Sequence, residues 1–119
     1  MKQLLLTAFL AFLSLTSFST TAQAADYEVE ICALQAHNVT STVYLQVCGG
    51  WTSKSNCPAD GFIAWDASTF QGETMYSTAL TAFSLGKTVS VRLTPNSCLR
   101  YDHTNMIRIL KERSDNLSN

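Results

Sequence analysis

Charged side chains are scarce in this chain. Of its 119 residues, 8 are Lys or Arg and 9 are Asp or Glu, which gives a net charge of −1 at pH 7. Proteins that bind nucleic acid through its phosphates need clustered cations, and the sequence contains no basic cluster. We therefore expect no nucleic-acid partner.

Metal-binding and catalytic motifs are missing as well. No two of the four cysteines have the Cys-x2-Cys spacing that is typical of zinc sites, and there are only two histidines. A set of Ser97, Asp102 and His103 contains the residue types of a hydrolase, but no nucleophile-elbow motif accompanies it. We interpret these three as solvated loop residues, and we expect neither a metal, nor a cofactor, nor an enzyme.

The only long apolar run lies at the N-terminus. It extends from Leu4 to Leu15, follows the positive charge of Lys2 and precedes Ala22-Gln23-Ala24. This is the pattern of a secretory signal peptide, and the run is too short to predict a membrane span. We expect residues 1–24 to be cleaved, a secreted or periplasmic location, and no membrane span after cleavage.

All four cysteines, Cys32, Cys48, Cys57 and Cys98, follow the expected signal peptide. An even number in a short exported chain indicates disulfides, and four cysteines allow three pairings. If residues 26–35 and 41–48 form a hairpin centred on Thr40, Cys32 lies opposite Cys48 on the face away from the core. We therefore predict the bridges Cys32–Cys48 and Cys57–Cys98.

The pattern of apolar residues predicts short strands and one helix. Alternation indicates strands, and the helix is expected to begin near Thr69 and to end at Gly86. On a helical wheel one arc, expected to face the core, contains Met75, Tyr76, Ala79, Leu80, Ala82 and Phe83. The segment 99–105 is polar and is expected to be exposed. The expected strands are 26–35, 41–48, 62–65, 88–93 and 106–110.

Five strands with a helix between the third and the fourth are the layout of the OB-fold, a small Greek-key barrel. We predict a mainly β, five-stranded OB-fold-like barrel of order β-β-β-α-β-β. The predicted domain covers residues 25–112, and residues 113–119 form a polar tail.

The chain also resembles the B subunits of subtilase-type and pertussis-like AB5 toxins. The resemblance covers residues 41–110 and depends on the phrases VYLQV, NCPADGFIAWDAS and MYSTALTAFSLGKTVSVRL, followed by a later cysteine. Those subunits are OB-folds that form rings of five and bind cell-surface glycans. The resemblance therefore implies a homopentamer, a glycan ligand and an exported catalytic subunit as partner. No glycan-binding motif of those subunits is found here.

Aromatic side chains next to polar groups are the candidates for a binding site. Trp51 lies in a loop rich in Gly and Ser, and a second group contains Asn96, Tyr101, Asp102 and His103. If Cys57 and Cys98 are bridged, the two groups approach each other, and we expect them to form a single cleft. Trp65 is expected to lie in the core.

Three functions compete on this basis. The first is a secreted carbohydrate-binding module of the toxin B-subunit kind. The second is a monomeric periplasmic or secreted protein-interaction or inhibitor domain that uses the same loops. The third is a small hydrolase that depends on His103.

Overall fold

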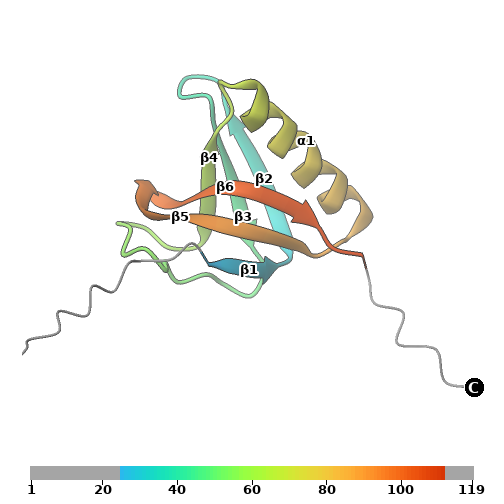
Figure 1. Ribbon diagram of the computed structural model, residues 1–119, viewed down its shortest axis with the longest axis horizontal. Coiled ribbons are helices and arrows are strands. Elements are labelled where there is room, and N and C mark those ends of the chain that lie inside the picture. The colour runs from blue at the N-terminus through green and yellow to red at the C-terminus, as the bar shows by residue number, and fades with distance from the viewer. Residues whose placement is uncertain (1–24, 112–119) are drawn as a thin grey trace, which may run out of the picture.

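The computed structural model describes residues 25–111. The signal peptide expected at residues 1–24 and the tail expected at 113–119 lie outside the described residues, as does residue 112 at the end of the predicted domain. Within residues 25–111 the chain forms one mainly β unit with a single helix (Figure 1). The elements are β1 Asp26–Val29, β2 Ile31–His37, β3 Thr42–Val47, β4 Phe62–Asp66, α1 Phe70–Leu85, β5 Val89–Leu99 and β6 Tyr101–Ile109.

The strands form one sheet in the order β1-β5-β6-β4-β3-β2. All neighbours are antiparallel except β4 and β6, which are parallel. The two edge strands, β1 and β2, are consecutive in the chain and are separated only by Glu30. The expected single first strand is thus two strands, because the chain turns at Glu30 from one sheet edge to the other. The described sheet has six strands and is not closed.

The helix begins and ends as its sequence predicts. Thr69 is the N-cap, and its hydroxyl accepts a hydrogen bond from the Gly72 N–H (3.0 Å). Gly86 ends the helix in the left-handed conformation (φ 63°), which glycine adopts without a steric cost. Beyond it, the Lys87 N–H donates to the carbonyl of Ala82 (2.9 Å).

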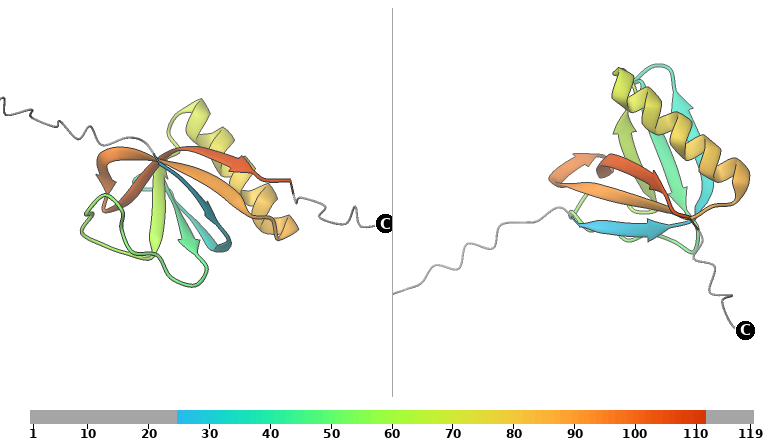
Figure 2. Two further views of the ribbon diagram at one scale, coloured as in Figure 1. Left: turned by 60° about the horizontal axis from the view of Figure 1, so that its bottom comes forward. Right: turned by 45° about the vertical axis from the view of Figure 1, so that its right-hand side comes forward.

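Helix α1 lies across the sheet and contacts β2 and β6, as the views in Figure 2 show. Ala79 and Ala82 are fully buried against the sheet, whereas Leu80 and Phe83 remain 43% and 42% exposed. The expectation that these two larger side chains lie in the core is therefore wrong, whereas Met75 and Tyr76 are partly buried and pack against the core. The alanines occupy the contact line because they let the helix backbone approach the sheet closely.

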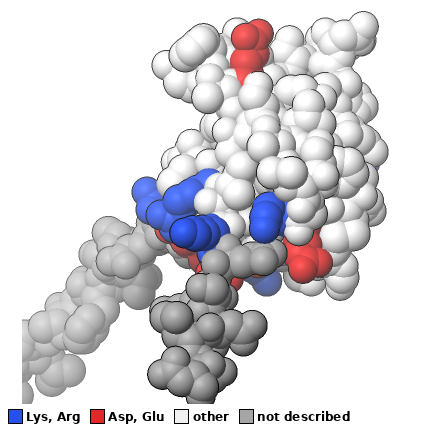
Figure 3. Space-filling model, turned by 90° about the vertical axis from the view of Figure 1, so that its right-hand side faces the viewer, with Lys and Arg blue, Asp and Glu red and all other residues white. Residues whose placement is uncertain are grey.

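The outward side of α1 carries mainly hydroxyl groups, with Glu73 in the first turn as its one charged residue. Each hydroxyl donates to the backbone carbonyl four residues earlier in the helix, at 2.8–3.2 Å. Four exposed apolar residues also belong to α1: Phe70, Leu80, Phe83 and Leu85. In Figure 3, most of the charged side chains on this face of the molecule lie in its lower part, and one acidic group lies near the top. The hydroxyl-bearing residues are Thr74, Ser77, Thr78, Thr81 and Ser84.

The core is formed by alternate strand residues and by the helix. Trp65, expected in the core, is 1% exposed, and its indole N–H donates to the Gly72 carbonyl (3.0 Å). Gly72 is itself buried, and a Cβ at this position would collide with the backbone of Asp66 and Ala67. The first helical turn therefore lies directly on the end of β4, which explains a glycine inside the helix.

Both predicted disulfides are present. Cys32–Cys48 has a Cα–Cα distance of 4.9 Å, and Cys57–Cys98 has one of 5.6 Å. The hairpin register is irregular between Ile31 and Ala33, which places Cys32 in a bulge. The predicted pairing is confirmed although the predicted register was regular.

We expected the polar segment 99–105 to be an exposed loop, and this expectation is wrong. Most of it belongs to β6, where Asp102 is 0% exposed and Thr104 is 1% exposed. The hydroxyl of Thr104 donates to the Arg92 carbonyl (2.7 Å). These side chains are buried because each has hydrogen-bond partners inside the protein, which hydrophobicity alone does not reveal.

Candidate functional site

The sheet has an inner face toward the core and an outer face away from it. In β4, Ile63 and Trp65 belong to the core, so Phe62 and Ala64 point outward. In β3, Tyr44 is the register partner of Ala64 and therefore also points outward. The outer face thus combines Tyr44 and Phe62 on neighbouring strands.

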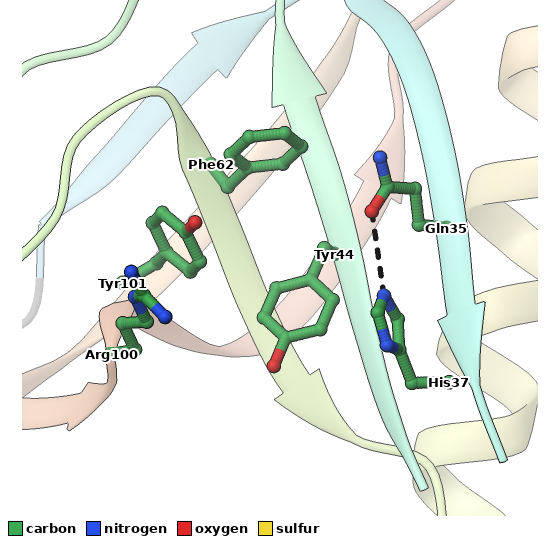
Figure 4. A pocket seen from close by; sticks show the side chains of 6 residues that line it. All are labelled: Gln35, His37, Tyr44, Phe62, Arg100 and Tyr101. Carbon is green, nitrogen blue, oxygen red and sulfur yellow. Dashed lines mark hydrogen bonds between the residues drawn. The ribbon is translucent and has the colours of Figure 1, made fainter. Parts of the chain in front are cut away.

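Strand β6 adds Tyr101 to the same face. Asp102 pairs with Ile63 and points inward, so Tyr101 and His103 on either side of it point outward. A cavity of about 160 Å³ opens on this face, between β2, β3, β4 and the β5–β6 turn (Figure 4). We call it the outer-face pocket, and its lining residues are Gln35, His37, Tyr44, Phe62, Arg100 and Tyr101.

The aromatic rings of the pocket contact one another. The Tyr44 ring lies edge-on to the rings of His37 (4.9 Å between centroids) and Tyr101 (5.5 Å). The Phe62 ring lies 5.1 Å from that of Tyr101. Such edge-to-face contacts add about 0.5–1.5 kcal/mol per pair beyond burial. The rings are therefore held in fixed positions by strands and by one another.

Polar groups surround these rings. A hydrogen bond of 3.4 Å joins His37 Nε2 and Gln35 Oε1. The Arg100 guanidinium lies 6.0 Å from the centre of the Tyr101 ring. Arg100 occupies the β5–β6 turn with φ 66°, a left-handed conformation that is uncommon for a residue with a side chain. The pocket thus combines aromatic surface with donors and acceptors.

A second cluster lies on the inner side of β6, around the buried carboxylate of Asp102. It accepts hydrogen bonds from the indole N–H of Trp51 (2.9 Å) and the hydroxyl of Ser53 (2.7 Å). The backbone N–H groups of Lys54 (2.8 Å) and Ser55 (3.2 Å) also donate to it. We call these five residues the Asp102 cluster. It fixes the long loop between β3 and β4 to the sheet.

Electrostatics agree with this structural role. Burial acts to raise the pKa of Asp102, but the hydrogen bonds from Lys54, Ser53 and Trp51 outweigh burial and hold the pKa below its usual value of 3.8. The carboxylate is therefore ionised at neutral pH and fully used by its donors. This leaves Asp102 without a lone pair directed at a ligand or at His103.

The histidine of β6 has a different partner. A hydrogen bond of 2.8 Å joins His103 Nδ1 and Ser97 Oγ on the outer side. Burial lowers the pKa of His103 below 6.5, and the charge of Asp66 opposes this shift. The set Ser97, Asp102 and His103 is thus divided between two sides of the sheet, and its carboxylate does not orient the imidazole.

The five sequence-predicted site residues fall into three places. Tyr101 lines the outer-face pocket, and His103 lies on the same face beside Ser97. Trp51 and Asp102 belong to the Asp102 cluster, where the Trp51 ring packs edge-on against Tyr27 (5.3 Å). Asn96 lines a smaller hollow of about 100 Å³. The disulfide brings the two loops together, but the five side chains do not share one cleft.

Sequence reasoning missed five of the six pocket residues. Tyr44 was already placed opposite the apolar residues of its strand, so its outward direction was predictable. Its position next to Phe62 depends on a register that the sequence does not specify. The other three came from strand ends and a turn: Gln35, His37 and Arg100.

Comparison with protein-family models, with curated proteins and with solved structures found no match to this chain. The resemblance to toxin B subunits therefore stays a prediction. Within residues 25–111, no helix has the length and apolar character that a membrane crossing requires. The same residues contain no group of three or more His, Cys, Asp or Glu side chains arranged to hold a metal ion.

Proposed function

We propose that this protein is a secreted carbohydrate-binding module and that the outer-face pocket is its binding site. The observation that carries the proposal is the grouping of Tyr44, Phe62 and Tyr101 around one cavity, with Gln35 and Arg100 at its rim. Binding sites for small molecules are concave, mainly aromatic or apolar, and contain a few placed polar groups. A sugar ring matches this composition because its C–H faces pack on aromatic rings while its hydroxyls bond to polar side chains.

The proposed fold agrees with this site. We infer an OB-fold-like arrangement in which β1 and β2 together correspond to one long, bent first strand. The parallel pairing of β4 with β6 and the helix between β4 and β5 support this inference. OB-folds bind oligosaccharides on the face of their second and third strands. Those positions correspond here to β3 and β4, which provide Tyr44 and Phe62.

Export and assembly belong to the same proposal. Two disulfides support an oxidising destination, either the periplasm or the medium. A ring of five copies with an exported catalytic subunit is the assembly that the resemblance implies. The outward side of α1 has one charged residue, Glu73, and exposes Phe70, Phe83 and Leu85; it is the surface we assign to contacts between copies. The mass of the mature protein in solution tests this assignment.

A protein-interaction or inhibitor domain is the second candidate function. The same exposed apolar residues of α1 favour it, because apolar patches of this kind mark protein contacts. It predicts a monomer and no glycan binding. We do not propose a hydrolase, since Asp102 is occupied by four donors.

A glycan array tests the proposed function. The full chain, exported and processed by its host, is compared with Tyr44→Ala and Tyr101→Ala, and with Val39→Ala as an exposed apolar control in the β2–β3 turn. We expect binding by the unmodified protein and by the control, and its loss in both pocket variants. Equal binding by all four proteins, or no binding to any glycan, contradicts the proposal.

A further inference from the structure

The outer face continues beyond the pocket. Ala64 is the register partner of Tyr44 on one side and of His103 on the other. Ala64 is 0% exposed although it points away from the core, so side chains of the outer face cover it. His103 lies two residues after Tyr101 along β6, which corresponds to about 7 Å. The surface next to the pocket is therefore formed by side chains of β4 and β6.

Two polar side chains are in contact at this continuation, and a third lies nearby on the same face. Ser97 Oγ and His103 Nδ1 are 2.8 Å apart, which holds the imidazole in one orientation. Asp66 is two residues beyond Ala64 and thus lies diagonally across from His103, on the same face. Its exposed carboxylate accepts the Ser68 N–H at 2.8 Å and is held by that bond.

These groups retain unused hydrogen-bonding capacity. A carboxylate has about four acceptor positions, and on Asp66 the N–H and the hydroxyl of Ser68 use at most two of them. In His103 the contact with Ser97 involves only Nδ1, so Nε2 remains for a further partner. The Asp66 carboxylate accepts hydrogen bonds from hydroxyl or amine donors, and His103 Nε2 donates or accepts according to its tautomer.

We propose that Asp66, His103 and Ser97 form a second subsite, which binds a sugar unit linked to the one in the outer-face pocket. The preferred ligand is then an oligosaccharide of at least two units, whose second unit presents hydroxyl or amino groups to Asp66. This inference rests on the proposed function of the pocket. It adds the size of the ligand and the chemistry of its second unit.

The test compares short and longer sugars. A printed array of neutral, amino and acidic mono-, di- and trisaccharides is probed with the full chain and with Asp66→Asn, which keeps an oxygen for the Ser68 N–H. Glu28→Gln on β1, which removes the charge of another exposed carboxylate, is the matched control. We expect the unmodified protein and the control to prefer disaccharides over their component monosaccharides by about tenfold, the value of one hydrogen bond to a charged group. In Asp66→Asn the preference should disappear while monosaccharide binding is unchanged.

Chemical-shift mapping with a bound disaccharide separates the two proposals. Shifts at Tyr44 and Tyr101 together with Ser97 and His103 support both. Shifts at Tyr44 and Tyr101 alone, or equal affinity for mono- and disaccharides, overturn the second subsite and leave the pocket standing. Shifts at Ser97 and His103 alone contradict the pocket, and the absence of any sugar binding overturns both.

Discussion

The indole N–H of Trp51 donates to the buried carboxylate of Asp102 at 2.9 Å, across 51 positions of sequence. This bond joins the loop after β3 to the strand that carries Tyr101 and His103. Asp102 therefore supports the outer-face pocket from the opposite side of the sheet.

Replacing Asp102 tests this support. Asp102→Asn keeps the shape of the side chain, but it removes the charge and turns one acceptor oxygen into a donor that faces N–H groups. Because hydrogen bonds to charged groups contribute about 1.5–3 kcal/mol each, we expect unfolding free energy to fall by at least about 2 kcal/mol in urea titrations. Asp60→Asn is the control, since Asp60 is exposed and accepts one bond from the Ser53 N–H. A control as unstable as Asp102→Asn would contradict this role.

Acid should weaken the same cluster. The pKa of Asp102 in the folded protein lies below 3.8, which is close to its value when unfolded. The resulting stabilisation is complete above pH 3.8 and is lost as the pH falls through the lower, folded pKa. We therefore expect the stability difference between the unmodified protein and Asp102→Asn to stay constant from pH 7 to 5 and to shrink below pH 3.8. Urea titrations at several pH values measure it, and a pH-independent difference would refute the argument.

The two disulfides should differ in their effect on the site. Chain entropy predicts a loss of about 4 kcal/mol for Cys57–Cys98, which closes 41 positions, and about 3 kcal/mol for Cys32–Cys48, which closes 16. Cys98 lies two residues before Arg100, whose carbonyl accepts the Ala59 N–H (3.1 Å). We expect the double Ser variant of Cys57–Cys98 to lose sugar binding under conditions in which it is still folded.

The matching double Ser variant of Cys32–Cys48 should keep sugar binding, because the pairing of β2 with β3 itself maintains the positions of Gln35, His37 and Tyr44. Circular dichroism confirms folding of both variants before binding is measured on the array. Loss of binding in both variants, or in neither, would show that Cys57–Cys98 has no particular role at the pocket.

Gly72→Ala tests the contact between helix and β4. Helix propensity alone predicts a gain of about 1 kcal/mol. The added methyl would instead meet the backbone of Asp66 and Ala67, which cannot move aside as a side chain does. We expect a net loss of about 1–3 kcal/mol in thermal or urea unfolding, whereas Ser77→Ala on the outward side of α1 should be neutral or slightly stabilising. A stabilised Gly72→Ala variant would contradict the described contact.

Local patterns predicted much of the fold. The positions of α1, β3 and β4 follow from the period of their apolar residues, and the burial of Trp65 follows from its place at the end of β4. Both disulfides were predicted. Strand alternation places Cys32 and Cys48 on the same face of the hairpin, and the two remaining cysteines, Cys57 and Cys98, then pair with each other. The split at Glu30 was missed, since the alternation continues through it and only the path of the chain reveals the turn.

The site was harder to predict than the fold. Tyr101, Asp102 and His103 are adjacent in sequence, yet strand alternation sends Asp102 inward and the other two outward. The sequence contains no apolar pattern at this segment, so only the second half of β6 was predicted, as the strand 106–110. Without the first half of β6, nothing brought Tyr101 to Tyr44 and Phe62, which are distant in the chain.

The hydroxyl groups along α1 have a consequence for assembly. All five already donate to carbonyls of their own helix. When a partner displaces water from this side of α1, the hydroxyl protons therefore keep their hydrogen bonds. Dehydration of the surface therefore carries a smaller penalty than its polar composition suggests. A second protein surface without matching polar groups would be a suitable neighbour for it.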